Sequence, residues 1–139
     1  MKNGELKKVK AKFNELRRSK QQRFPSDHKK LEAPIERGVY VIYGPRDEVL
    51  HVGGTPRGRR GICQRLSNHL HGQSSFTHKS LFLKQHGGRT LQGRCKYVRK
   101  HCTYRCLPIE KDDRLRALVE AYAIGCLCPD HIGLHQLAP

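Results

Sequence analysis

The sequence predicts a small sandwich of mixed α/β (α+β) class, in which helices flank a three-stranded antiparallel sheet. The first observation is the order of the elements, which periodicity and turn residues indicate to be strand, strand, helix, helix, strand and helix. The second is the length, because 139 residues leave room for one domain with a modest core. The third is that no apolar run approaches the roughly 18 residues that cross a bilayer, so we expect no membrane span.

Residues 1–33 are interpreted as a basic N-terminal arm that is largely helical, and residues 34–139 as the domain proper. Within the arm, a thin apolar stripe recurs at spacings of three and four, at Leu6, Val9, Phe13 and Leu16. Such a helix would lie against DNA or against a partner. The alternative is a solvated, partly disordered tail that only raises the net charge.

Two β-branched runs, at about 38–43 and 48–52, predict the strands of a hairpin. A turn centred on Pro45-Arg46 would place Tyr40 opposite His51. Their β-carbons would then be about 5 Å apart on one face of the sheet. We therefore expect a tyrosine and a histidine to act side by side.

The segment 53–61 is rich in glycine and arginine, so backbone amides and guanidinium groups can approach a phosphate closely. The arginines in question are Arg57, Arg59 and Arg60. The alternative is a flexible basic connector. The helix that follows carries Arg65 and His69 on one face, because they are four residues apart, beside the apolar line of Ile62, Leu66 and Leu70.

The second half of the chain predicts two further helices and the third strand. Thr77 would cap a helix that runs to about Gln85, and the loose alternation of residues 94–101 predicts a strand. Asp112-Asp113 would open the last helix, which extends to about Cys126 with acidic residues at its positive end.

This last helix is apolar nearly all round from Ala117 to Cys128, apart from Glu120, so we expect it to be mostly buried. A buried carboxylate must be paired, protonated or bound to a cation. An ion pair with Arg65 is the structural alternative to a cation.

The formal charge of +16, from 28 Lys and Arg against 12 Asp and Glu, favours a polyanionic partner, with nucleic acid ahead of an anionic membrane surface. Cys102-x-x-x-Cys106 and Cys126-x-Cys128, with His101 and His131 nearby, would suit a zinc site only loosely. Without a secretory signal, we expect reduced thiols and a cytoplasmic location.

Taken in order, Gly38-Val39-Tyr40, His51-Val52-Gly53, Arg65-x-x-x-His69 and a later lone Glu120 resemble the GIY-YIG nuclease superfamily. The resemblance covers roughly residues 37 to 131. His51 stands where the family usually has its second tyrosine, the loop is longer than usual, and His131 lies near the place of an asparagine often found after the glutamate.

The resemblance implies a metal-dependent endonuclease that hydrolyses DNA phosphodiester bonds, whether in restriction, repair or homing. Glu120 would hold a single divalent ion, Mg²⁺ or Mn²⁺, Arg65 would clamp a phosphate oxygen, and Tyr40 or His69 would be the general base. A double-strand break would need a homodimer or two visits. A non-catalytic nucleic-acid-binding protein and a zinc-stabilised interaction module remain the alternatives.

Overall fold

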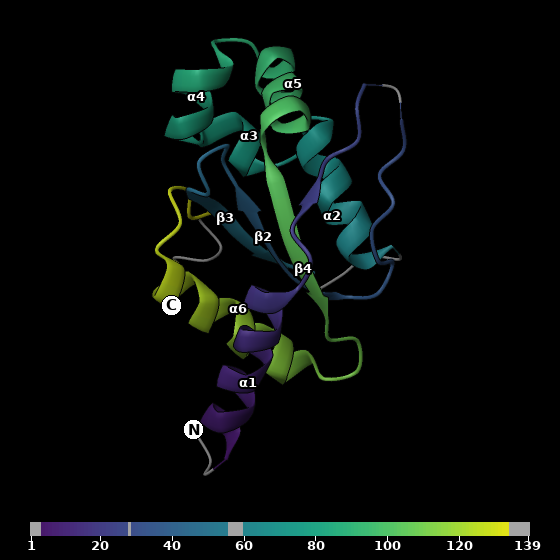
Figure 1. Ribbon diagram of the computed structural model, residues 1–139, viewed down its shortest axis with the longest axis vertical. Helices are drawn as coiled ribbons and strands as arrows, with labels where there is room; N and C mark the ends of the chain where they lie inside the picture. The colour runs from purple at the N-terminus through teal and green to yellow at the C-terminus, as the bar shows by residue number, and fades with distance from the viewer. Residues whose placement is uncertain (1–3, 28, 56–59, 134–139) are drawn as a thin grey trace.

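The computed structural model describes residues 4–27, 29–55 and 60–133. In that part of the chain, one antiparallel sheet has four strands in the order β1-β4-β2-β3 (Figure 1). The strands are β1 (Gln22–Arg23), β2 (Gly38–Tyr43), β3 (Val49–Gly54) and β4 (Thr103–Pro108). The predicted α/β sandwich is confirmed, and the strand beyond the expected three is the two-residue β1, which pairs with β4 at one edge.

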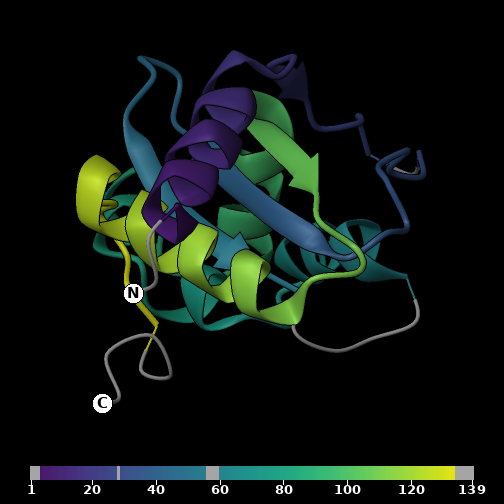
Figure 2. The same ribbon diagram turned by 90° about the horizontal axis from the view of Figure 1, so that it is seen from below.

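Helices α1 (Glu5–Arg18) and α6 (Asp113–Leu127) pack side by side on one face of the sheet (Figure 2). The predicted stripe of α1 is helical, and its residues Val9, Phe13 and Leu16 are buried. They form one core with the residues of β2 and β3 that face this side of the sheet and with Val119 and Ala123 of α6. The apolar side of α1 therefore lies against the protein's own sheet. The alternative of a solvated tail would require this side to face solvent.

The other face of the sheet is covered by α2 (Gly61–Leu70), α3 (Ser75–Lys79), α4 (Leu81–Gly87) and α5 (Leu91–His101). The core on this side includes Ile62, Leu66 and Leu70, the apolar line expected of the Arg65 helix. Successive residues of a strand point to opposite faces. Tyr40 and Ile42 of β2 therefore belong to this core, whereas Val39 and Val41 belong to the other.

The hairpin register differs from the predicted one by two residues. Tyr40 lies opposite Gly53, and His51 lies opposite Ile42. The turn contains an additional residue, Asp47, with a left-handed φ of 61°, a conformation that Asp tolerates. Leu50 then has no counterpart in the ladder, which is a β-bulge. Because the two one-residue offsets add up to two, Tyr40 and His51 keep the same face but become diagonal neighbours.

The predicted strand over residues 94–101 is wrong, because these residues belong to helix α5. The buried residues there are Arg94 and Val98, four apart as a helix requires, and Thr90 caps the helix by accepting a hydrogen bond from the backbone N–H of Gly93. The third long strand is β4, in which Tyr104 and Cys106 alternate inward.

Two predictions about the remaining helices need correction. The helix expected from Thr77 to Gln85 is two helices, capped by Ser74 and Ser80, whose hydroxyl groups accept from backbone N–H groups. Helix α6 begins after its cap Asp112 as predicted, but it is not mostly buried. Its buried residues are Arg116, Val119 and Ala123, because only one side of α6 faces α1 and the sheet.

Strand β3 is at an edge of the sheet, and the chain after α6 returns to it. The backbone N–H groups of Asp130 and His131 donate to the carbonyl oxygens of Val49 and Leu50, at 3.0 and 2.9 Å. His131 and His51 thereby form a parallel bridge. Among the described residues, no helix is long and apolar enough to cross a membrane.

Candidate active site

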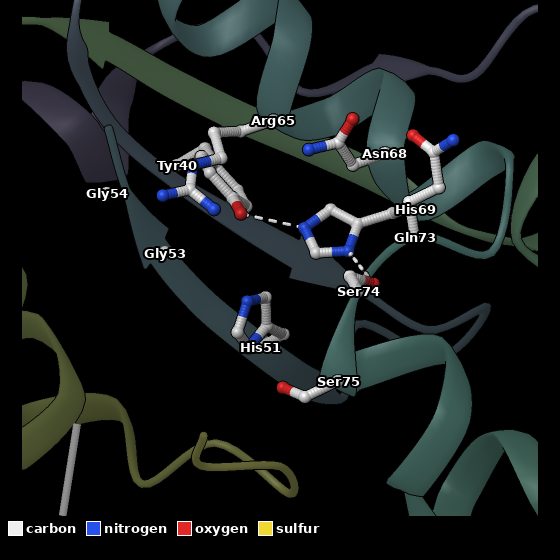
Figure 3. Close-up of a pocket in the computed structure, with 10 residues that line it drawn as sticks. All are labelled: Tyr40, His51, Gly53, Gly54, Arg65, Asn68, His69, Gln73, Ser74 and Ser75. Carbon is white, nitrogen blue, oxygen red and sulfur yellow. Dashed lines mark hydrogen bonds between the residues drawn. The ribbon is translucent and has the colours of Figure 1, made fainter. Parts of the chain in front are cut away.

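Four of the predicted site residues line one pocket, called here the Tyr40 pocket. Tyr40 and His51 come from the hairpin, and Arg65 and His69 from α2 (Figure 3). The pocket has a volume of about 240 Å³, and its other lining residues are Gly53, Gly54, Asn68, Gln73, Ser74 and Ser75. The structure thus brings together a phenol, two imidazoles and a guanidinium group that lie up to 29 residues apart in the sequence.

Two glycines at the end of β3 make room for two of these functional groups. A β-carbon on Gly53 would overlap the phenol of Tyr40, and one on Gly54 would overlap the carboxylate of Glu120. The two glycines are adjacent, so their missing side chains point to opposite faces of the strand. Tyr40 and Glu120 therefore approach the same edge strand from its two faces, with one strand between them.

Glu120 is not among the residues that line the Tyr40 pocket. It is half-buried on α6 and lines a neighbouring hollow with Thr55 and Arg116. Arg116, which lines the same hollow, pairs with Asp113 at 2.6 Å. A carboxylate beside an open hollow fits a Mg²⁺ or Mn²⁺ ion, because these ions prefer oxygen ligands and retain several waters.

A continuous hydrogen-bonded chain runs from Tyr40 to α3. The hydroxyl of Tyr40 lies 2.7 Å from Nε2 of His69, and Nδ1 of the same ring lies 2.7 Å from Oγ of Ser74 (Figure 3). Ser74 Oγ lies in turn 3.2 Å from Oγ1 of Thr77. His69 is buried, with 3% of its surface exposed, so its two ring nitrogens are held by protein groups rather than by bulk solvent.

The electrostatic environment keeps both Tyr40 and His69 neutral. Burial raises the pKa of Tyr40 above its ordinary value, with Arg65 opposing and Glu120 reinforcing this shift. Burial also lowers the pKa of His69 well below 6.5, and the nearby His51, Arg65 and His131 lower it further. At neutral pH the site therefore contains a phenol and an imidazole, not a phenolate and an imidazolium.

His51 is buried between aromatic rings rather than exposed on the hairpin. Its ring stacks on Phe76 with a centroid distance of 5.1 Å and an interplanar angle of 11°. The ring centroids of His69 and His131 lie 5.2 and 5.7 Å away, and that of Tyr40 lies 5.9 Å away. His51 is thus a buried residue and not a surface histidine of the hairpin.

The cysteines do not gather into a metal centre. All six are free thiols. Cys102 and Cys106 are buried in the core on the α2 side, and burial raises the pKa of Cys106 to about 11, whereas Cys126 and Cys128 are exposed. Over residues 4–27, 29–55 and 60–133, no group of three or more His, Cys, Asp or Glu side chains is placed to hold a metal ion.

Arg57 and Arg59 lie outside the described residues. Arg60 is exposed and lines a second feature, called here the Arg99 trough. The trough consists of three hollows that share Arg99 and lie on the opposite side of α2 from the Tyr40 pocket. Its lining includes the single acidic residue Asp27 and seven cationic residues, namely Arg23, Lys29, Lys30, Arg60, Lys96, Arg99 and Lys100.

Ser74 was not among the residues that the sequence singled out for the site. The sequence did contain an indication of its place, because a serine three residues before Thr77 is in the position of a helix N-cap.

Comparisons of the chain with protein-family models and with curated proteins found no match.

Proposed function

We propose that this protein is a metal-dependent endonuclease that hydrolyses DNA phosphodiester bonds through a GIY-YIG-type site. The observation that carries the proposal is the convergence of Tyr40, Arg65 and His69 on one pocket, with the Glu120 carboxylate across a single strand. Phosphoryl transfer needs a route for the proton of the attacking water and positive charge around the phosphate. Tyr40 with His69 provides the first, and Arg65 provides part of the second.

The proton route passes through Tyr40 to His69. Because burial raises the pKa of Tyr40, a standing phenolate is disfavoured, and the phenol is better suited to a relay. As the water attacks phosphorus, its proton moves to the oxygen of Tyr40, while the phenolic proton transfers within the hydrogen bond to Nε2 of His69, which lies 2.7 Å from that oxygen. The phenol is unchanged in net composition, and His69 becomes the imidazolium.

Arg65 lines the pocket beside Tyr40 and is half-buried, so its planar guanidinium group can contact two oxygens of a phosphate. When bound, Mg²⁺ or Mn²⁺ would be held by Glu120 and water and would supply Lewis-acid stabilisation of the leaving oxygen. The Arg99 trough extends the cationic surface beyond α2, where flanking phosphates of the DNA would bind.

The direct test is nicking of supercoiled plasmid by the purified full chain, with Mg²⁺ and with EDTA. We expect nicked circles with Mg²⁺ and none with EDTA. Linear product at early times would indicate that a homodimer cuts both strands. The absence of nicking with either Mg²⁺ or Mn²⁺, by protein that binds the plasmid, would refute the proposed activity.

DNA binding is tested separately through its salt dependence. Lys96→Gln/Lys100→Gln removes two exposed cations of the Arg99 trough, and Lys7→Gln/Lys10→Gln removes two exposed cations from α1 on the far face of the sheet. Each lost phosphate contact reduces the magnitude of the slope of log affinity against log salt by about one. We expect the double substitution in the Arg99 trough to reduce this magnitude by about two and the double substitution in α1 to change it little. The reverse result would assign DNA binding to the exposed side of α1 rather than to the Arg99 trough.

The second candidate is a non-cleaving nucleic-acid-binding protein, favoured by the burial of Tyr40, of which 2% is exposed. If this candidate is correct, the protein should bind DNA with the salt dependence described above but should not nick the plasmid. We further propose a cytoplasmic location, since free thiols are typical of a reducing compartment.

A further inference from the structure

The chain Tyr40–His69–Ser74–Thr77 contains four groups that can each donate a proton, and the positions of their acceptors favour one direction for the whole chain. At the far end, the buried hydroxyl of Thr77 lies 3.0 Å from the carbonyl oxygen of Ser74, to which it donates. Oγ1 of Thr77 is then an acceptor toward Oγ of Ser74, 3.2 Å away. The hydroxyl proton of Ser74 is therefore directed at Thr77.

With its proton directed at Thr77, Ser74 Oγ accepts at its 2.7 Å contact with Nδ1 of His69. It also accepts from the backbone N–H of Thr77 at 3.4 Å, as the N-cap residue of α3. A hydroxyl oxygen has two lone pairs, so both acceptances are satisfied. Nδ1 of His69 therefore carries the proton of the neutral ring, and Nε2 carries none.

The other end of the chain requires the same direction. The phenolic proton of Tyr40 needs an acceptor, and within the described residues the hydrogen-bond partner of that hydroxyl is Nε2 of His69, at 2.7 Å. With the chain running from Tyr40 toward Thr77, every buried donor has an acceptor. Reversing the chain would turn the phenolic proton into the pocket and would leave the 3.2 Å contact between Oγ of Ser74 and Oγ1 of Thr77 without a proton.

We propose that Ser74 is a positioning residue that sets the tautomer of His69, so that Nε2 is the proton acceptor for Tyr40. The kinetic part of this inference rests on the proposed endonuclease function, whereas the tautomer itself does not. Ser74 does not contact the scissile phosphate in this role. It acts through His69, in the way that the partner of one ring nitrogen of a histidine determines the state of the other.

The experiment compares two N-cap serines of the same fold. Ser74→Ala removes the cap of α3 together with the contact to His69. Ser80→Ala removes the corresponding cap of α4, where Ser80 accepts from the backbone N–H of Leu83 at 3.2 Å. Ser80 belongs to neither the Tyr40 pocket nor the hydrogen-bonded chain. We expect similar lowering of Tm from both substitutions, and Ser74→Thr, which keeps a hydroxyl group, should restore the function of Ser74.

The tautomer is read by ¹⁵N NMR of histidine-labelled full-length protein at neutral pH, where protonated and unprotonated ring nitrogens have widely separated shifts. The signals of His69 are identified among those of the nine histidines by their loss in His69→Gln. We expect a protonated Nδ1 and an unprotonated Nε2 in the wild type, in Ser80→Ala and in Ser74→Thr. In Ser74→Ala, the populations should shift toward protonated Nε2.

The single-turnover rate of plasmid nicking should fall about 10- to 100-fold in Ser74→Ala and stay near the wild-type rate in Ser80→Ala and Ser74→Thr. A protonated Nε2 in the wild type, or His69 signals unchanged by Ser74→Ala, would overturn the proposal. If the wild type shows the expected tautomer and its dependence on Ser74 but does not nick DNA, the positioning role stands and the proposed nuclease function fails.

Discussion

The two faces of the sheet use the same strands for different purposes. On the α1 and α6 side, Val39, Val41 and Val52 pack with Phe13 and Val119 in a core of aliphatic and aromatic side chains. On the α2 side, Tyr40 and His51 from the same strands join a buried hydrogen-bonded and aromatic cluster beside an equally apolar core. Alternation along β2 and β3 lets one face stabilise the fold while the other presents chemistry.

The largest expected effect falls on the apolar face and is confined to stability. Phe13→Ala removes a buried ring that meets Tyr122 edge to face at 5.3 Å. We expect it to lower the free energy of unfolding by about 3–5 kcal/mol, measured by urea denaturation. The nicking rate per folded molecule should not change. The exposed control Lys10→Ala should cost little, and unchanged stability in Phe13→Ala would mean that residues 1–33 are an independent arm after all.

The next prediction concerns the one functional group that comes from the apolar side, Glu120. Glu120→Gln is nearly isosteric but loses the charge that would bind the metal in the proposed mechanism, so we expect nicking to slow about 10³-fold while Tm and DNA affinity stay the same. Glu15→Gln, on the exposed side of α1, is the control. A near wild-type rate would remove the metal assignment, and a collapse of Tm with the rate preserved would indicate a structural ion pair.

Among substitutions on the α2 side of the sheet, the loss of nicking rate should be larger the closer the residue lies to the proposed proton route. Tyr40→Phe removes the oxygen of the proposed proton relay and should slow single-turnover nicking about 100-fold. His51→Ala should cost about 10-fold, and His51→Tyr should retain substantial activity because its hydroxyl can replace the imidazole nitrogen in positioning water. Rates measured from pH 6 to 9 complete the comparison. Full activity in His51→Ala would limit His51 to packing on Phe76.

The smallest expected effect is a pH dependence of the free energy of unfolding. It should arise from the histidines on the α2 side of the sheet and not from the core on the α1 and α6 side. Because the pKa of His69 is lower in the folded than in the unfolded protein, its contribution to stability is present above about pH 6.5 and is lost as the pH falls below it. The loss is at most about 1.4 kcal/mol per pH unit for this group.

Urea denaturation at pH 7.5, 6.5 and 5.5 measures this dependence. Neighbouring His51 and His131 also face the cluster and add to it, so the informative quantity is the difference between the wild type and His69→Gln. That variant should have a shallower pH dependence, whereas the exposed His101→Gln should match the wild type. Equal dependence in all three proteins would contradict the neutral state of His69.

The elements with strong local signals were predictable from sequence. The hairpin, the Arg65 helix and the last helix were expected within one or two residues, because β-branched runs, a regular apolar line and an acidic cap act locally. The register was not, since it depends on an additional turn residue and a bulge at Leu50. Residues 94–101 were assigned to a strand because loose alternation outweighed the four-residue spacing of Arg94 and Val98.

The candidate site was predictable as a set of residues but not as a hydrogen-bonded chain. Tyr40, His51, Arg65 and His69 were identified from their order and spacing, and the structure places all four at one pocket. Ser74 at the pocket and His131 beside the ring of His51 were not expected there, since each arrives only through tertiary packing: Ser74 contacts His69 of α2, and the segment after α6 returns to β3. Long-range returns of this kind leave little trace in local periodicity.

The return of residues 130–131 to β3 also bears on self-association. An edge strand exposes a row of unpaired backbone groups onto which a strand of another molecule can add, and this is a common route to aggregation. Here the carbonyl groups of Val49 and Leu50 are already occupied by Asp130 and His131. The segment after α6 therefore covers part of that edge and blocks the addition of another strand there. A chain shortened before Asp130 should precipitate more readily on heating than the intact protein.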